Sequence, residues 1–189
     1  GSAAAAALAS LGPAGSPWIL KLVEDPELED ADLAALATQL ADAGHEDGLA
    51  ALLDVVVERG TTRVALTPLR HARQAGRLPT VPHSIMRRVL QPILRTGARY
   101  AVLADAFRRE RRRHAYLEVL HEELRDRRDR AAEGVLASLS LHYDPDTLDR
   151  VAPHLRSTEA ATRSNALELL EGLLEPEDRI EGIPFFEGL

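Results

Sequence analysis

The sequence predicts an all-α protein, built as a short α-solenoid of antiparallel helix hairpins. Apolar residues make up 45% of the 189-residue chain but aromatic residues only 4%, so alanine and leucine supply most of the bulk. That mixture favours close-packed helices over pleated sheets, which use β-branched and aromatic side chains. Apolar positions also recur every three or four residues, and no stretch alternates over the length of a strand.

The first residues predict a linker rather than a folded element. Residues 1–20 contain no charged side chain, and Gly12, Pro13, Gly15 and Pro17 interrupt them. A membrane-spanning helix would need about 20 strongly apolar residues, and a signal peptide would start with basic ones. The Gly1-Ser2 pair resembles a cloning remnant. We expect a linker over 1–15 and a single helical-repeat domain over 16–189, as part of a larger protein.

The first clear hairpin is predicted over residues 30–60. Asp30 is expected to cap a helix that Gly44 ends, and a second helix follows as far as Gly60. The apolar stripes of the two helices are Leu33, Leu36, Ala37 and Leu40, then Leu49, Leu52, Leu53, Val56 and Val57.

The middle of the chain is less regular. Thr67-Pro68 is expected to open a short helix that Gly76 closes, because proline fits the first turn and glycine the end of a helix. Pro79 and Pro82 then predict a turn before the next helix, which Pro92 should kink and Gly97 should end.

From Ala98 to Tyr143 the sequence contains no proline, yet one long helix is not expected. Residues 108–113 read Arg-Arg-Glu-Arg-Arg-Arg, which leaves no apolar position through more than a full turn. We expect an exposed joint there and a second helix from about His114 to Tyr143. The predicted core stripes on either side are Tyr100, Leu103 and Phe107, then Leu117, Leu120, Leu124, Ala131, Val135 and Leu139.

The second clear hairpin is predicted over residues 144–175. Asp144-Pro145 should start a helix reaching Leu155, Ser157 should cap the next one, and Pro176 should stop it. Leu167 and Leu170 are expected to be buried in this hairpin. It aligns with the first hairpin at a constant offset of 115 residues, which predicts a repeated unit. The apolar residues after Pro176 predict either a cap or the start of a further unit.

The net charge of −7 is unevenly distributed. Residues 61–130 hold 17 basic and 7 acidic residues, a net charge of +10, whereas the two ends are acidic. Such a middle segment could bind an anionic partner or form a solvated, salt-bridged face, and the acidic neighbours favour the face. The candidate contacts to an anionic partner are Arg108, Arg109, Arg111, Arg112, Arg113, Arg127 and Arg128.

Signals for catalysis or metal binding are weak. His114, Glu118 and His121 share one helix face, and the Glu-x-x-His spacing is used in di-iron bundles, but no second such motif exists in the chain. A solvated helix face is the favoured interpretation. There is no cysteine, no Gly-x-Ser-x-Gly elbow and no phosphate-cradling loop. We therefore expect no catalytic residues, no metal and no cofactor.

The later part of the chain carries a family resemblance. Residues 117–124, 139–145 and 164–174, which include Leu-His-Tyr-Asp-Pro and Asn-Ala-Leu-Glu-Leu-Leu, resemble a HEAT repeat. They look like the HEAT-like domains attached to bacterial nucleotide-translocase-like membrane transporters. The resemblance implies a cytoplasmic domain, tethered to an upstream transmembrane region, that docks another protein or another domain of its chain. No binding residues come with it.

Two functions from different classes follow from these observations. The first is a non-enzymatic protein-interaction or regulatory scaffold, which the repeated hairpins favour. The alternative is an anion-binding module for membrane headgroups or nucleic acid, which rests on the basic middle segment. Nucleic acid is the less favoured ligand, because few aromatic residues are interleaved with the arginines for base stacking.

Overall fold

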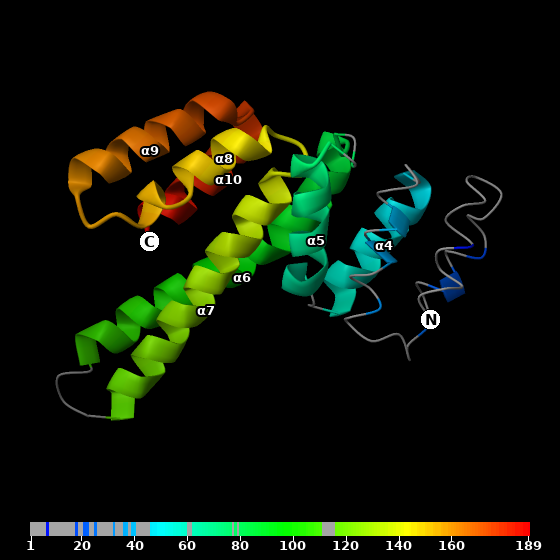
Figure 1. The fold of residues 1–189 in the computed structure, drawn as a ribbon. Coiled ribbons are helices and arrows are strands. Elements are labelled where there is room, and N and C mark those ends of the chain that lie inside the picture. Colours follow the sequence, from blue (N-terminus) through cyan, green and yellow to red (C-terminus); the bar gives the residue numbers. More distant parts are fainter. Residues whose placement is uncertain are drawn as a thin grey trace. The chain divides into compact units, whose positions relative to one another are not determined.

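The computed structural model describes residues 7, 18, 21, 22, 25, 32, 36, 37, 39, 40, 46–59, 62–76, 78, 80–110 and 116–189. Regular structure in these residues is helical throughout, and they contain no strand, which confirms the all-α prediction for this part of the chain (Figure 1). The labelled helices are α4 (Glu46–Arg59), α5 (Thr62–Gln74), α6 (His83–Glu110), α7 (Tyr116–Leu139), α8 (Pro145–Val151), the 3-10 helix η3 (His154–Arg156), α9 (Ala160–Leu173) and α10 (Pro176–Glu187).

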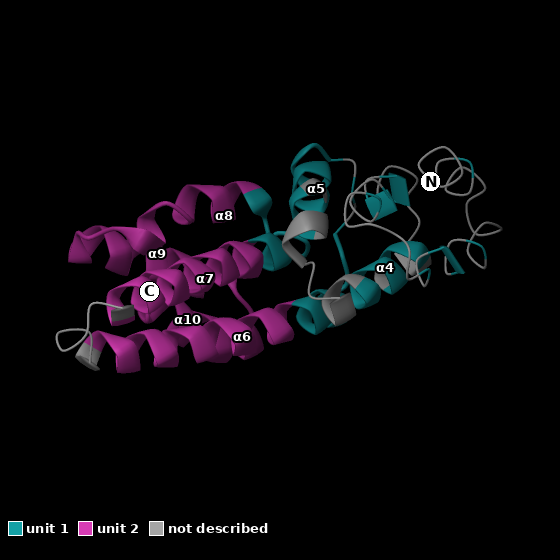
Figure 2. Ribbon diagram, turned by 90° about the horizontal axis from the view of Figure 1, so that it is seen from below, with its two compact units in different colours: residues 1–89, 137–145 teal, residues 90–136, 146–189 magenta. Residues whose placement is uncertain are grey.

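The chain divides into two compact units (Figure 2). Unit 1 consists of Gly1–Val89 and Ala137–Pro145, and unit 2 of Leu90–Leu136 and Asp146–Leu189. Helices α6, α7 and α8 each contribute residues to both units. Each unit is built from segments that are distant in the sequence.

The core of unit 1 contains six of the apolar residues predicted for the first hairpin, and the side chains of the other three, Leu33, Val56 and Val57, are not described. Its buried side chains in the early part of the chain are Leu36, Ala37, Leu40, Leu49, Leu52, Leu53, Leu66, Leu69 and Ala72. Helices α4 and α5 pack against each other. The expected caps and stops at Asp30, Gly44 and Gly60 lie outside the described residues.

Helix α5 begins earlier than predicted. It starts at Thr62, five residues before the Thr67-Pro68 pair, and passes through Pro68. The predicted start was wrong because the buried face already includes Leu66, so packing extends the helix upstream of the proline. The predicted end at Gly76 is confirmed. Gly76 has a φ of 69°, which is the left-handed conformation that glycine adopts without a steric penalty.

Two distant turns meet in unit 1. The Val81 N–H donates a hydrogen bond to the Leu141 carbonyl at 2.9 Å. The Nδ1 atom of His142 lies 2.9 Å from the Val81 carbonyl oxygen, and it must donate this bond because a carbonyl only accepts. The turn after α7 is thereby fixed to the segment before α6. Leu139, Leu141, Ser138 and Ser140 are buried around it.

In unit 2, helices α6 and α7 form an antiparallel hairpin. Ala104 on α6 lies opposite His121 on α7, whose Nδ1 is 3.1 Å from the Ala104 carbonyl oxygen. Earlier positions on α6 face later ones on α7, since a Cβ at Gly97 would lie 2.9 Å from Ala131 and one at Gly134 would lie 3.2 Å from Ile93. Helix α6 continues to Glu110, so residues 108–110 of the expected joint are helical, and the rest of that joint lies outside the described residues. Helix α7 is described from Tyr116 onward.

Three details of this hairpin correct the sequence prediction. Gly97 does not end α6, because its missing side chain makes room for Phe185 and Ala131 inside a continuous helix. Leu103 and Leu120, expected in the core, are exposed, and small Ala104 is buried instead. Small residues let the two helix axes approach closely, which moves the contact face away from the larger leucines.

The second hairpin is confirmed in outline and corrected at its caps. Pro145 is the first residue of α8, but this helix ends at Val151, and Leu155 is buried in η3. Ser157 does not cap α9, which starts at Ala160 after Glu159; the Ser157 hydroxyl accepts the Glu159 N–H at 3.2 Å. Ala166 and Leu170 are buried, whereas Leu167 is only half-buried. Helix α9 packs against η3 and α10.

The apolar residues after Pro176 form helix α10, with Pro176 in its first turn. Phe186 is fully buried, and α10 packs against α9. Within unit 2 this segment therefore folds back as a cap.

Candidate docking groove

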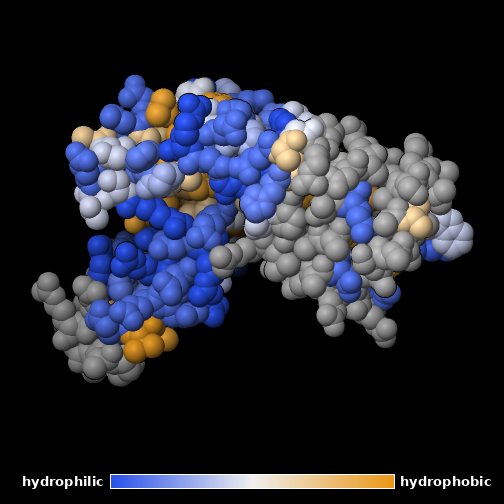
Figure 3. Space-filling view, viewed as in Figure 1, coloured by the Kyte–Doolittle hydropathy of each residue, from blue (hydrophilic) through white to orange (hydrophobic). Residues whose placement is uncertain are grey.

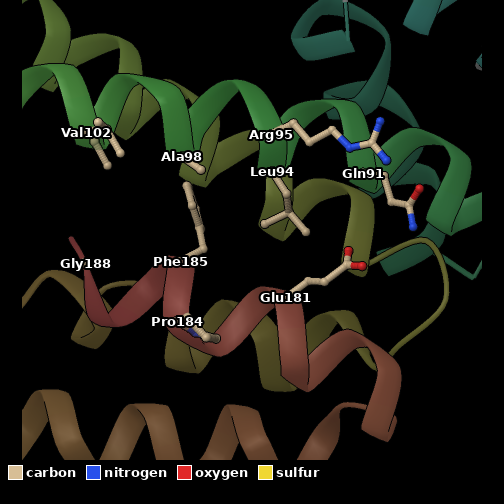
Figure 4. A pocket seen from close by; sticks show the side chains of 10 residues that line it. Gln91, Leu94, Arg95, Ala98, Val102, Glu181, Pro184, Phe185 and Gly188 are labelled. Carbon is tan, nitrogen blue, oxygen red and sulfur yellow. The ribbon is translucent and has the colours of Figure 1, made fainter.

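The clearest hollow in unit 2 lies between α6 and α10 (Figure 4). It has a volume of about 450 Å³. Its apolar lining includes Leu94, Ala98 and Val102 from α6, and Pro184 and Phe185 from α10. Gln91, Arg95 and Glu181 contribute polar groups at one end of the groove in Figure 4.

Helical spacing places these residues on facing sides of the two helices. On α6 the lining positions recur every three or four residues between Gln91 and Val102, which spans about 16 Å of helix. On α10 they recur in the same way from Glu181 to Gly188. The residue numbers rise in the same direction along both helices in Figure 4, so α6 and α10 are roughly parallel.

Phe185 is the side chain that joins the groove to the core. A Cβ built on Gly97 would lie 2.6 Å from the Phe185 Cε2 atom, so the ring occupies the space that glycine leaves open on α6. The Phe185 and Phe186 rings meet edge to face at 5.3 Å. Phe186 thus anchors α10 inside unit 2 while Phe185 lines the groove.

The end of α10 is held by Arg128 of α7. The Arg128 Nη1 atom donates a hydrogen bond to the Gly188 carbonyl at 3.1 Å. Its Nη2 atom lies 3.4 Å from Asp129 Oδ1. This cation at the C-terminal end of α10 satisfies a carbonyl that the helix leaves open and complements the helix dipole. The groove wall is therefore fixed from two sides.

Some large apolar side chains of α6 and α10 are exposed. In the view of Figure 3, hydrophilic residues cover most of the coloured surface, with smaller hydrophobic patches among them. Val102, which lines the groove, is 71% exposed, and Ile180, adjacent to Glu181 on α10, is 75% exposed. Large apolar side chains with this exposure beside an apolar hollow are typical of a surface that a partner covers.

The candidate anion contacts do not form one described cluster. Arg111, Arg112 and Arg113 lie outside the described residues, and the side chain of Arg109 is not described. Arg108 forms an exposed ion pair with Asp105 at 3.1 Å. Arg128 is occupied by Gly188 and Asp129, as described above.

Arg127 belongs to an exposed network with Glu123 and Tyr100. Its Nε donates to Glu123 Oε1 at 2.7 Å, and its guanidinium lies 5.9 Å from the centre of the Tyr100 ring. The hydrogen bond from Arg127, and then its positive charge, hold the pKa of the Glu123 carboxyl below its usual value. The hydrogen bond to Glu123, followed by the interaction with Tyr100, raises the pKa of Arg127. An arginine with these internal partners would have to exchange them to bind an external anion.

Two of the three residues of the metal-type motif, Glu118 and His121, lie among the described residues. His114 lies outside the described residues, and Glu118 is exposed on α7. His121 is half-buried and uses Nδ1 for the Ala104 carbonyl. The part of the chain with assigned positions contains no group of three or more potential metal ligands.

A second, smaller hollow of about 330 Å³ lies between α8, η3 and α9. Its lining includes Arg150, His154, Asn165 and Leu169. The Arg150 guanidinium already donates to the Thr147 hydroxyl at 3.0 Å and to the Asp146 carbonyl at 3.3 Å. This hollow is smaller and more polar in its lining than the α6–α10 groove.

Neither groove was predicted from the sequence. The two walls of the α6–α10 groove are distant in the sequence, since more than 80 residues separate Arg95 from Glu181 and Phe185. No motif links them. The exposed Val102 beside the expected core residue Leu103 is a signal that could have indicated a second apolar face on α6.

None of the helices in the described ranges is both long enough and apolar enough to cross a membrane. Comparison of the chain with protein-family models, with curated proteins and with solved structures finds no match. The functional argument therefore depends on the geometry of the molecule.

Proposed function

We propose that this chain is a non-enzymatic protein-interaction domain, and that the α6–α10 groove binds a helical segment of another protein. The observation that carries the proposal is the apolar groove itself, which is lined by Val102, a strongly exposed apolar side chain. Apolar side chains lose hydration free energy when a partner covers them, at about 25 cal/mol per Å².

The shape of the groove favours a helix as the occupant. Two roughly parallel helices leave a straight channel about 16 Å long between Gln91 and Val102, the length of three helical turns. An amphipathic helix fills such a channel with side chains at positions i, i+3 or i+4, and i+7. An extended peptide would gain no backbone hydrogen bonds from the groove walls, because neither wall is a strand edge.

The anion-binding alternative has weaker support. Among the candidate arginines with described side chains, Arg108, Arg127 and Arg128 each have an acidic neighbour within 3.4 Å. Binding a phosphate would require breaking these pairs. The alternative stays a hypothesis for the segment from Arg111 to Arg113.

We further propose that α8, η3 and α9 correspond to a HEAT-like helix pair. Two observations support this assignment: α9 packs on η3, and the apolar residues of the segment are buried, namely Leu148, Val151, Leu155, Ala166 and Leu170. The tethering of such a unit to a membrane protein, and a cytoplasmic location, belong to this same proposal and rest on the sequence resemblance.

The docking proposal is tested with a neutral probe. A synthetic 14-residue helical peptide with a leucine face and glutamine elsewhere is titrated into the isotope-labelled protein, and amide shifts are followed by NMR. We expect shifts concentrated on α6 between Gln91 and Val102 and on α10. A Val102→Asp variant should lose binding, because a carboxylate would be desolvated against apolar groups.

The matched control is Val119→Asp, which changes an exposed valine on α7 outside the groove. Thermal melts followed by circular dichroism establish that both variants are folded. Binding that is unaffected by Val102→Asp, or shifts confined to other helices, would show that the groove is not the docking site.

A further inference from the structure

We propose that the partner helix carries carboxylates along the edge that faces α6, where they pair with Arg95 and Arg99. This inference rests on the proposed docking function and adds the chemistry of the partner. The apolar groove supplies affinity, and the arginine pair supplies selection among apolar helices.

The occupant is a partner helix rather than a second copy of the same face. The groove is concave between α6 and α10, and two concave faces placed together would enclose an unfilled hollow of roughly twice about 450 Å³. A single convex helix fills the hollow instead. The shape therefore favours a heterologous partner.

Arg95 and Arg99 differ from the other arginines of α6 whose pairs are known. Arg88 is bonded to Asp54 at 2.6 Å within unit 1, and Arg108 is bonded to Asp105 at 3.1 Å within unit 2. Arg95 and Arg99 are exposed, and neither forms a hydrogen bond or ion pair with any residue in the described ranges.

Their positions make these two arginines the basic edge of the groove. Arg95 lines the groove, and Arg99 follows one helical turn later on the same side of α6. The opposite wall carries Glu181. The groove thus has a basic edge on α6 and an acidic group on α10, which fits a helix with carboxylates on one side and neutral or basic residues on the other.

The size of the effect follows from the exposure of the pair. Ion pairs between exposed groups are weak, so each carboxylate–arginine pair should tighten binding about 2- to 4.5-fold at low salt. Two pairs should together give about four- to twenty-fold. At 0.5 M NaCl, where the screening length falls to about 4 Å, most of this gain should disappear.

The test uses two synthetic 14-residue peptides with the same leucine face. One carries glutamate at two positions four residues apart along one edge, and the other carries glutamine there. Dissociation constants are measured by fluorescence anisotropy at 50 mM and 500 mM NaCl. We expect the glutamate peptide to bind about four- to twenty-fold more tightly at the lower salt concentration.

Protein variants assign the gain to particular residues. The double variant Arg95→Gln, Arg99→Gln should bind both peptides equally, whereas Arg125→Gln, Arg130→Gln, which removes two exposed arginines from α7, should retain the preference. The charge-reversed variant Arg95→Glu, Arg99→Glu should prefer a third peptide with lysine at the two edge positions.

The outcomes separate this inference from the docking function. If the wild-type protein binds the glutamate and glutamine peptides equally, the inference is wrong and the docking groove stands. If neither peptide binds, both fail. If duplex DNA at equal charge concentration displaces the glutamate peptide completely, the arginine edge reads polyanions in general, and the partner assignment is overturned.

Discussion

Gly97 of α6 and Phe185 of α10, both in unit 2, are packed so closely that any side chain at position 97 would overlap the phenylalanine ring unless the ring moved. A Cβ on Gly97 would lie 2.6 Å from Phe185 Cε2 and 2.9 Å from the Ala131 Cβ. Glycine weakens a helix interior by about 1 kcal/mol relative to alanine, so the close approach of α10 and α7 must offset that loss. Gly97 thus weakens α6 locally but allows Phe185 of α10, which lines the groove, to pack against α6.

Gly97→Ala is predicted to destabilise the protein despite its better helix propensity. Overpacking a filled core costs about 1 to 3 kcal/mol, which exceeds the gain of about 1 kcal/mol in propensity. The matched control is Gly172→Ala in α9, where a Cβ would meet nothing within 4 Å and should add about 0.5 to 1 kcal/mol. Urea unfolding measures both. A Gly97→Ala protein that is more stable than wild type would contradict the packing described here.

Leu170 and Leu169 are neighbours on α9 with opposite environments. Leu170 is 0% exposed and Leu169 is 61% exposed. Leu170→Ala should lower the free energy of unfolding by about 2 to 5 kcal/mol, because it leaves a cavity. Leu169→Ala should change it by less than about 0.5 kcal/mol. Equal effects on the melting temperature would indicate that α9 is rotated from its position in the structure.

The Glu123 carboxyl should titrate below the usual glutamate value of about 4.3. Its pKa is lower in the folded than in the unfolded protein, so the Arg127 pair stabilises the fold above the unfolded pKa. That contribution is lost as pH falls through the folded pKa. Carbon-13 NMR titration measures the midpoint, which Arg127→Gln should raise. Arg125→Gln is the control, and a midpoint that stays unchanged in Arg127→Gln would refute the assignment.

His121 is predicted to matter through its hydrogen bond rather than through metal binding. Its Nδ1 lies 3.1 Å from the Ala104 carbonyl, and it joins α7 to α6. His121→Leu should cost about 0.5 to 1.5 kcal/mol, the usual net value of one hydrogen bond. His121→Asn should cost less, because the asparagine amide can donate from a similar position. Thermal unfolding of the two variants distinguishes this role from simple packing, which would favour leucine.

Hydrophobic periodicity and proline positions were sufficient to predict the helical class, the presence of two antiparallel helices in place of one long helix, and the start of α8 at Pro145. The predicted joint began at Arg108, whereas α6 continues to Glu110, because Arg108 is exposed and pairs with Asp105, so its charge is not buried. Local signals of this kind act within one or two turns. They do not depend on which helices become neighbours.

The errors have a common cause in tertiary contacts. Gly97 has the sequence context of a helix stop, yet Phe185, 88 positions later in the chain, requires its small size. Leu103 has the hydrophobicity of a core residue, yet small Ala104 takes the contact face toward His121. The groove was missed for the same reason, because its two walls come from distant parts of the sequence.

The hydrogen bond between Val81 and Leu141 can form only late in the synthesis of the chain on the ribosome. Unit 1 consists of Gly1–Val89 together with Ala137–Pro145, so its last piece is synthesised well after its first. At about 5 to 20 residues per second, the nascent chain waits several seconds between Val89 and Pro145 with the Val81 backbone group still open to water. For the same reason no single cut in the gene releases unit 1 intact, and a shortened chain in which a linker joins Val89 to Ala137 would be needed to contain all of unit 1.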